Sequence, residues 1–117
     1  MSTLPYPLWS AGDPPALLAS RDLERGELIF PAVPDNSPLA ERHEVVAVER
    51  VGTVYSFTII HPGAKSGLAP YALGYVDFPG PVRIFGRLQG KAQPAIGDHY
   101  EPRADAAFGY VFESVGA

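Results

Sequence analysis

The fold is decided by residues 51–90, VGTVYSFTIIHPGAKSGLAPYALGYVDFPGPVRIFGRLQG. Three runs within this stretch, 53–61, 71–78 and 82–88, are rich in Val, Ile, Tyr, Phe and Thr, and Gly or Pro punctuates the sequence around each of them. β-Branched and aromatic residues between such breakers are typical of short strands. The stretch therefore predicts three consecutive β-strands.

The run 82–88 also predicts which side chains face the core. Successive side chains of a strand point to opposite faces, so residues two apart share a face. The residues on the two faces are Val82, Ile84 and Leu88 on one, and Arg83, Phe85 and Arg87 on the other. We expect the apolar face to be core and the basic and aromatic face to be accessible for contact.

Two further runs, 45–51 and 108–113, continue the pattern outside this stretch. Gly52 separates the first of them from 53–61 and predicts a bend or bulge, as where one long strand turns a barrel corner. The last run follows a looser stretch that contains Pro94, Gly97 and Pro102. Five or six short strands fit a small barrel, so the sequence predicts a mainly β fold.

The residues before this β region begin with an arm. Residues 1–15 contain four prolines, whose fixed φ and missing amide hydrogen favour an extended conformation. We expect Tyr6 and Trp9 to hold this arm in place.

The segment that follows the arm has two interpretations. In the first, residues 14–25 form a helix with Asp13 as its N-cap and Gly26 as its stop. In the second, 16–21 and 27–32 are short strands joined by a tight knuckle. The local sequence alone does not decide between them. A breaker-rich loop then separates this segment from the rest of the chain, with prolines at Pro31, Pro34 and Pro38.

Length and composition limit the chain to one domain with an appendage. It has 117 residues, 46% of them hydrophobic, and a net charge of −4, which is typical of a globular chain that folds in water. No apolar stretch reaches the roughly 18 residues that span a bilayer. The first residues lack the basic start of a secretory signal, so we expect a cytoplasmic protein with no membrane partner. The absence of cysteine excludes disulfides, thiolate nucleophiles and cysteine-bound metal.

No set of residues predicts catalysis, metal binding or a bound cofactor. The motifs of a hydrolase nucleophile elbow, a dinucleotide site and a phosphate-binding loop are absent. The three histidines have no paired spacing, which favours surface histidines over metal ligands; they are His43, His61 and His99. Four acids lie in turn-like contexts, where a carboxylate commonly accepts backbone hydrogen bonds; they are Asp77, Asp98, Glu101 and Asp105.

Several short pieces of the sequence agree with one known family in their order and spacing. The pieces are Gly52–His61, Ala69–Tyr71, Gly74–Gly80, Val82–Gly90 and Ile96–Asp98. They resemble the OB-fold domain of an acyl-CoA-associated family that also carries a rubredoxin-like zinc ribbon (domain of unknown function 35). Residues 18–31 resemble that ribbon. The resemblance implies an OB-type barrel over 42–117, preceded by the arm and a degenerate ribbon hairpin over 1–41.

The ribbon of that family carries two Cys-x-x-Cys knuckles, and this chain departs from them. Asp22 with Arg25 stand at one matching pair of positions, and Asn36 with Leu39 stand at about the other. This set cannot replace the thiolates of a structural zinc site. The resemblance therefore implies a hairpin that persists without zinc, which favours the two-strand interpretation of residues 16–32.

The resemblance implies a non-catalytic accessory subunit. Members of the family are typically partners of thiolase-like, aldolase-like or hydratase enzymes that act on coenzyme A thioesters, and the partner carries out the chemistry. We therefore expect a hetero-oligomer with such an enzyme, in which this chain contributes to acyl-CoA binding or only to the docking of the partner.

The candidate contact site is basic and aromatic. Between residues 51 and 97 Asp77 is the sole acid, and the basic residues are Lys65, Arg83, Arg87 and Lys91. We take as the candidate site Lys65, Arg83, Phe85 and Arg87. Three roles stay open for this face: a solvated strand face, contact with an acidic surface of the partner, or contact with the phosphates of coenzyme A.

A single-stranded nucleic-acid-binding OB domain is the alternative function. Such barrels bind single strands through stacked aromatic side chains in a positive groove. The aromatic residues that fit this role are Tyr55, Phe57, Tyr71, Tyr75 and Phe85. The chain is acidic overall and its barrel region has few basic residues, which disfavours binding to phosphates of a nucleic acid. We therefore expect no nucleic-acid partner.

Overall fold

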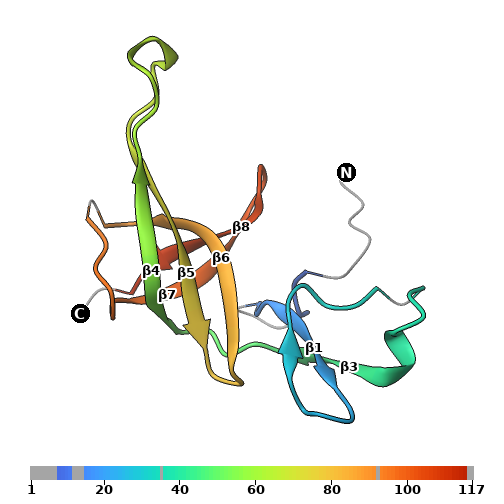
Figure 1. Cartoon of the computed structure of the whole chain (residues 1–117). Helices are drawn as coiled ribbons and strands as arrows, with labels where there is room; N and C mark the ends of the chain where they lie inside the picture. Colours follow the sequence, from blue (N-terminus) through green and yellow to red (C-terminus); the bar gives the residue numbers. More distant parts are fainter. Residues whose placement is uncertain (1–7, 12–14, 35, 92, 116–117) are drawn as a thin grey trace. The chain divides into compact units, whose positions relative to one another are not determined.

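The computed structural model describes residues 8–11, 15–34, 36–91 and 93–115 (Figure 1). Two compact units divide the chain: one comprises Met1–Arg50 and Phe78–Val82, and the other comprises Val51–Asp77 and Arg83–Ala117. The described residues form a three-stranded sheet and a closed barrel. Within them, no helix has the length and apolar character needed to cross a membrane.

Five strands form the closed barrel. They are β4 (Gly52–Ile60), β5 (Tyr71–Phe78), β6 (Val82–Gln89), β7 (His99–Asp105) and β8 (Gly109–Ser114). Their order around the barrel is β4-β5-β6-β8-β7, and β7 closes it by pairing with β4. β6 and β8 run parallel, whereas β4–β5 and β7–β8 are antiparallel. This is the five-stranded Greek-key arrangement of an OB fold, and it confirms the predicted mainly β class.

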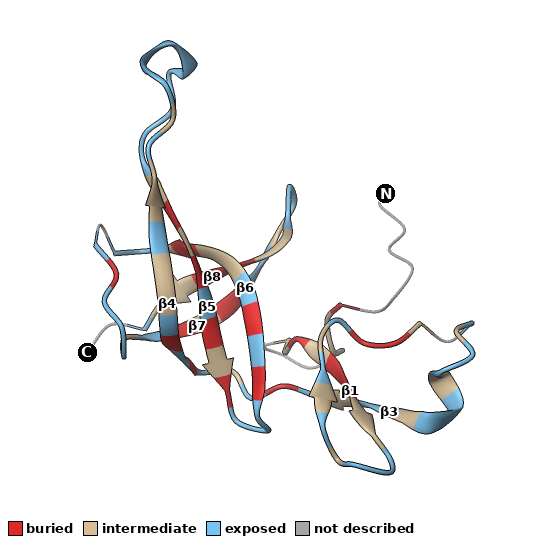
Figure 2. Ribbon diagram, in the orientation of Figure 1, coloured by how far each residue is buried: buried red, intermediate tan, exposed pale blue. Residues whose placement is uncertain are grey.

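The alternation along β6 is confirmed (Figure 2). Val82, Ile84 and Leu88 are 6%, 1% and 4% exposed. Arg83 and Phe85 are exposed, and Arg87 is half-buried. The same rule operates on β5, where Ala72 and Val76 are buried while Tyr75 is exposed. The barrel core is therefore built by the inward residues, and the outward residues of β5 and β6 form a common surface.

The stretch before the last strand differs from the expectation. The structure forms β7 there, although the sequence predicts only a looser segment. Pro102 weakens the strand pattern of this segment, because proline is disfavoured inside a sheet. The structure tolerates Pro102 because β4 pairs with β7 at His99 and Tyr100. Pro102 lies outside this paired part of β7, so its missing amide hydrogen removes no bond to β4.

The predicted irregularity of the first barrel strand is present, but at a different residue. β4 begins at Gly52, and the register of β4 against β5 shifts between Val54 and Ser56. Tyr55 is thus the extra residue, and its side chain is 52% exposed. Because a bulge adds one residue to a strand and bends it, it re-aims the side chains on either side.

The N-terminal sheet has the order β2-β1-β3, and its strands are β1 (Leu18–Asp22), β2 (Leu28–Ile29) and β3 (His43–Ala47). The two-strand interpretation of this segment is confirmed and the helix over 14–25 is wrong. β1 pairs with β2 on one side and with β3 on the other. A local sequence pattern does not show this pairing, because β3 is distant from β1 in the chain. A 3₁₀ turn, η1 (Ala40–Arg42), precedes β3.

The placement of β3 corrects the expectation for residues 45–51. The sequence predicts that these residues belong to the barrel, yet β3 pairs with β1 over its whole length, from Ala47 opposite Leu18 to His43 opposite Asp22. The break before Gly52 therefore separates two sheets, and the N-terminal part of the fold reaches beyond residue 41.

The arm is tied to this sheet through Trp9. Trp9 forms a β-bridge with Leu17, and the amide of Leu18 donates to the carbonyl of Leu8 at 2.9 Å. Leu17 is fully buried. The predicted role of Trp9 is thus confirmed, whereas Tyr6 lies outside the described residues.

The knuckle between β1 and β2 is closed by a carboxylate. Asp22 Oδ1 accepts hydrogen bonds from the amides of Glu24 and Arg25 at 2.8 and 3.1 Å, and these bonds lower the pKa of Asp22 below its ordinary value. Gly26, with φ of 76°, donates its amide to the Asp22 carbonyl at 2.7 Å. The turn is therefore held by bonds that need no metal ion.

Replacing Ser20 by Ala should destabilise the N-terminal sheet. Ser20 is 1% exposed, and its Oγ accepts the buried amide of Val33 at 2.8 Å. Removing the hydroxyl leaves that amide buried without a partner, which costs about 1–2 kcal/mol. Urea unfolding should show this loss, and the same change at exposed Ser66 should shift the midpoint little. Equal midpoints for the two variants would contradict the role given to Ser20.

Candidate functional site

A groove of about 440 Å³ lies on the outer surface of the barrel. We call it the β5–β6 groove, and its lining residues are Leu68, Tyr71, Leu73, Phe85, Gly86, Arg87, Phe108 and Tyr110. β5 and β6 are the second and third strands of the barrel. The loops after β4 and β7 contribute Leu68 and Phe108 to the lining, and β8 contributes Tyr110. In OB folds this strand face and these two loops form the usual binding surface. The groove is therefore the candidate functional site.

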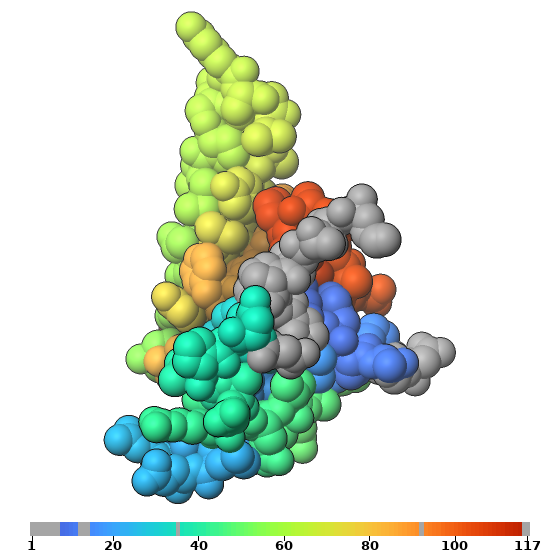
Figure 3. All heavy atoms as spheres, turned by 90° about the vertical axis from the view of Figure 1, so that its right-hand side faces the viewer, coloured from blue at the N-terminus to red at the C-terminus, as the bar shows by residue number. Residues whose placement is uncertain are grey.

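Two loops supply large apolar side chains at the rim of the groove. The β4–β5 hairpin extends well beyond the barrel strands (Figures 1 and 3) and carries Leu68, which is 67% exposed. Phe108 lies in the β7–β8 turn and is 61% exposed. Asp105 holds this turn, because its Oδ2 accepts the amides of Ala107 and Phe108 at 2.9 and 2.8 Å.

The floor of the groove depends on Gly86 and Tyr110. A Cβ at Gly86 would lie 2.7 Å from Cε2 of Phe112 and 3.0 Å from Cε2 of Tyr110, so only glycine leaves room for both rings. The Tyr110 hydroxyl donates to the Phe85 carbonyl at 2.5 Å. These contacts link β6 to β8 beneath the groove, where Gly86 and Tyr110 form part of its lining.

Arg83 is already paired within the strand face. Its Nε lies 2.6 Å from Asp77 Oδ1, and its Nη2 lies 3.1 Å from Oδ2, which is a bidentate ion pair. The hydrogen bond with Asp77 raises the pKa of Arg83. Its guanidinium carbon also stands 3.4 Å from the centroid of the Tyr55 ring. An exposed pair of this kind contributes little to stability, but it occupies the guanidinium.

Arg87 differs from Arg83 in its surroundings. Its guanidinium carbon lies 4.5 Å from the centroid of the Tyr71 ring. Within the part of the chain that the structure describes, Arg87 forms no ion pair with a carboxylate. It lines the β5–β6 groove and also a neighbouring hollow of about 250 Å³ that Lys91 borders. Arg87 is thus the cation of this surface that retains its capacity to bind an anion.

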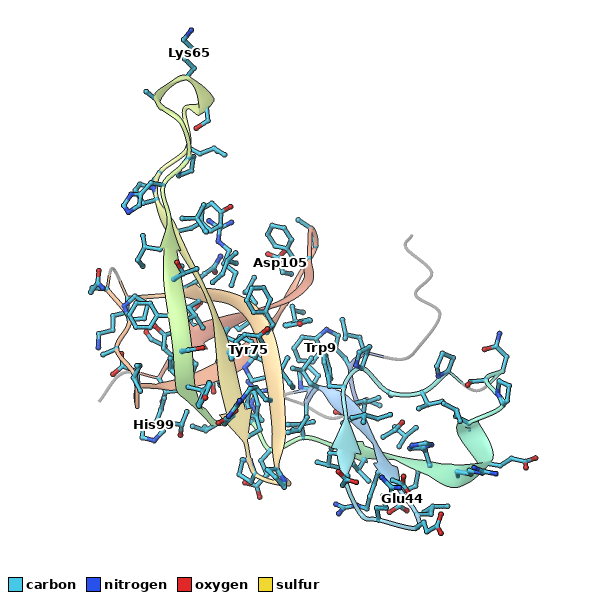
Figure 4. The ribbon with its side chains drawn as sticks, viewed as in Figure 1. Trp9, Glu44, Lys65, Tyr75, His99 and Asp105 are labelled. Carbon is cyan, nitrogen blue, oxygen red and sulfur yellow. The ribbon has the colours of Figure 1, made fainter. Side chains whose placement is uncertain are left out.

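The structure brings three of the four predicted site residues together. Arg83, Phe85 and Arg87 share the outer face of β6, and Phe85 packs edge-to-face against Tyr75 with the ring centroids 5.0 Å apart. Lys65 lies in η2 (Ala64–Ser66) at the tip of the β4–β5 hairpin, away from Tyr75 (Figure 4). It does not line the groove.

The positive patch predicted around this site is smaller in the structure than in the sequence. Lys91 Nζ lies 2.7 Å from Asp98 Oδ2, and this bond lowers the pKa of Asp98. Asp98 also accepts the amide of Ala95 at 2.9 Å, as expected for an acid in a turn. Two of the four predicted cations, Arg83 and Lys91, are therefore neutralised by neighbouring carboxylates.

Phe108 and Tyr110 are not among the site residues predicted from the sequence. They are distant from β6 in the chain, and the parallel pairing of β6 with β8 brings them to it. The residues Asp105–Gly109 carried a usable signal, because an Asp before a turn glycine predicts a tight turn with its intervening side chains exposed.

The described lining residues of the groove are mainly apolar and aromatic. They contain no carboxylate and no imidazole. Across the described residues, no group of three or more His, Asp or Glu side chains is placed to hold a metal ion. His43 Nδ1 lies 2.8 Å from the Leu39 carbonyl, which is a structural contact.

We expect the purified protein to contain no stoichiometric zinc. The chain has no cysteine, and Asp22 at one knuckle position is already engaged with backbone amides. Elemental analysis of the purified protein should find far less than one zinc per chain, and a chelator should leave thermal unfolding unchanged. About one zinc per chain, lost together with the folded state on chelation, would refute this prediction.

The barrel matches one family model. The family is described as the C-terminal OB-fold domain of ChsH2, and its model matches residues 45–105. The chain belongs to this ChsH2-type OB family. The match covers β4 to β7 in full and confirms the resemblance found in the sequence. Residues 18–31 lie outside it, so their likeness to a zinc ribbon stays a prediction.

Two curated relatives of this ChsH2-type OB chain are subunits named BbsA of benzoylsuccinyl-CoA thiolase. The chain is 39% identical to the one from Thauera aromatica over 80 residues, which is 68% of this chain and 56% of the relative. It is 35% identical to the one from Geobacter metallireducens over 80 residues, or 68% and 55% of the two chains. The chain thus spans about half the length of the curated relatives it matches.

A solved structure, described as the Ltp2-ChsH2(DUF35) aldolase, has the same fold. It superposes with a TM-score of 0.63 over 85% of this chain and 84% of its own, at 22% sequence identity. At this identity the likeness shows the fold alone.

Proposed function

We propose that this chain is a non-catalytic accessory module that docks on an enzyme acting on acyl-CoA, in a cytoplasmic hetero-oligomer. The observation that carries this proposal is the β5–β6 groove, which is apolar, exposes Phe85 and Phe108, and has no carboxylate or imidazole among its described lining residues. Such a surface, with exposed aromatic side chains beside an arginine, suits the binding of a protein partner. The names of the relatives, a thiolase subunit and an aldolase complex, favour a thiolase-like or aldolase-like partner, and a hydratase is a third candidate from the family resemblance.

Direct contact with acyl-CoA is a finer part of the proposal. Lys65 and Arg87 have no carboxylate partner among the residues that the structure describes. Cations of this kind bind phosphate groups through charge-assisted hydrogen bonds. Lys65, at the tip of the β4–β5 hairpin and outside the groove, is the one of the two that would reach coenzyme A when the partner covers Arg87.

The nucleic-acid alternative is less well supported by the same surface. Base stacking needs accessible ring faces, but Arg83 covers one face of Tyr55 and Arg87 covers one face of Tyr71. Tyr75 and Phe85 pack against each other. With Lys91 also paired to Asp98, the barrel lacks the row of unpaired cations that would track a phosphate backbone.

Co-purification of the tagged full chain from its native host tests the proposed function. We expect a thiolase-like or aldolase-like enzyme to co-elute in a fixed ratio, and the complex to turn over an acyl-CoA substrate that the chain alone does not. Bound nucleic acid in place of an enzyme would support the alternative. Turnover by the pure chain, abolished by a single substitution within it, would overturn the accessory role.

A further inference from the structure

We propose that the β5–β6 groove takes an acidic, apolar segment of the partner polypeptide, with a bulky apolar side chain between Phe85 and Phe108 and a carboxylate on Arg87. This inference rests on the proposed function and assigns the surface through which it is exercised. Three features of the described residues carry it: the shape of the rim, the state of the two arginines, and the number of cations within reach.

The rim favours a polypeptide over a small molecule. Pockets for small ligands typically bury most of the ligand surface, whereas this groove is bordered by side chains that themselves project into solvent. The exposed fractions of Leu68, Phe85 and Phe108 are 67%, 46% and 61%. A docked segment would cover these side chains, and aromatic residues beside an arginine are the usual energetic centre of a protein–protein interface.

The difference between the two arginines selects the charge of the partner. Arg83 is neutralised by Asp77, with 2.6 Å between Arg83 Nε and Asp77 Oδ1. The guanidinium of Arg87 lines the groove and has no carboxylate partner among the described residues. Burying Arg87 under a partner requires an opposite charge, because an unpaired charge in an interface is costly. The partner segment therefore carries an acid. The chain has a net charge of −4, so an acidic segment is repelled by the molecule as a whole and attracted at Arg87. The groove is therefore a specific docking site for such a segment.

The number of cations distinguishes a carboxylate from the phosphates of coenzyme A. Arg87 is the one Lys or Arg among the described lining residues of the groove. Lys91 beside it is held by Asp98 at 2.7 Å, and Lys65 stands at the hairpin tip. A single guanidinium matches one carboxylate in bidentate geometry, whereas several phosphates need several cations.

The test is a titration of the isotope-labelled full chain followed by NMR at the amides of Gly86 and Phe108. The probe is the peptide acetyl-DLFELD-amide, and the comparison ligands are acetyl-KLFKLK-amide, coenzyme A and a thymidine octanucleotide. We expect saturable shifts with the acidic peptide and much weaker ones with the other three. Arg87→Gln should weaken the acidic peptide roughly tenfold, as expected for the loss of one charge-assisted hydrogen-bonded pair.

Arg83→Gln is the matched control, since it makes the same change on the same strand face at an arginine that is already paired. It should leave the affinity within about twofold, because Asp77 already occupies the Arg83 guanidinium. Phe108→Ser provides a second loss-of-binding variant at an exposed turn position. Circular dichroism should show that all three variants are folded.

Equal weakening by Arg83→Gln and Arg87→Gln would overturn the inference, as would tighter binding of coenzyme A or the oligonucleotide at the same amides, or no shift with the acidic peptide. The variants are then used in the co-purification assay. An enzyme that co-elutes equally with wild type and Arg87→Gln shows that the accessory function holds and the groove assignment fails. Peptide binding without any co-eluting enzyme shows that the proposed function fails and the groove specificity holds.

Discussion

Replacing Ile84 by Asp should unfold the barrel. Ile84 is 1% exposed and lies on the inward face of β6. The charged form of an acid at this position loses its hydration without gaining a partner, a penalty of several kcal/mol. That is comparable with the roughly 5–15 kcal/mol of stability of a typical domain. Circular dichroism and thermal unfolding should show loss of the β signal and of the cooperative transition.

Ile96→Asp is the matched control for this change. Ile96 is 72% exposed, so the same substitution keeps its carboxylate in water and should leave the transition nearly unchanged. A folded Ile84→Asp protein with a wild-type transition would show that the inward and outward faces of β6 are assigned the wrong way round.

Replacing Gly74 by Ala should produce the second largest loss of stability. A Cβ at this position would lie 2.5 Å from the backbone oxygen of Ser56, and 3.0 Å from both Leu88 Cδ1 and Phe57 Cβ. The Ser56 carbonyl belongs to β4, which pairs with β5 here, so it cannot move without disturbing the ladder. We expect a cost at the upper end of the roughly 1–3 kcal/mol of overpacking, measured as a lower urea midpoint.

Gly63→Ala is the control for the change at Gly74. Nothing lies within 4 Å of a Cβ built at Gly63, and its φ of −57° suits any residue. This variant should keep the wild-type midpoint or raise it slightly through a less flexible unfolded chain. If both variants unfold at the same urea concentration, the close approach of β4 and β5 at Gly74 does not exist in solution.

The strands that sequence analysis found share one property. The runs 53–61, 71–78, 82–88 and 108–113 have β-forming residues between breakers, and all became strands. The strand that it missed, β7, contains Pro102 and the polar residues of His99–Asp105. β7 forms because β8 pairs along it from Tyr100 to Asp105. Pairing with a neighbour thus overrides a weak local preference, which a pattern within one run does not show.

The local sequence pattern also does not predict which sheet a strand joins. Residues 43–47 and 52–60 are both β-forming and close in sequence, yet the first pairs with β1 and the second with β5. Strand propensity reports that a segment is extended, but partner choice depends on contacts between distant segments. The same limit explains why the local sequence alone does not decide between a helix over 14–25 and a hairpin over 16–32, since β1 is held by pairing with both β2 and β3.

The sequence by itself determined the mainly β class, the inward and outward faces of β6 and the exclusion of cysteine chemistry, because strand period, breaker positions and composition are local properties of the chain. Only the tertiary structure decided which of the two outward arginines is paired with a carboxylate and which one can bind an anion. Arg83 and Arg87 are equivalent by strand period, but the register of the folded sheet sets Asp77 against Arg83 and the Tyr71 ring against Arg87. Cross-strand neighbours are fixed by register and closure of the barrel, and neither is encoded within a single strand.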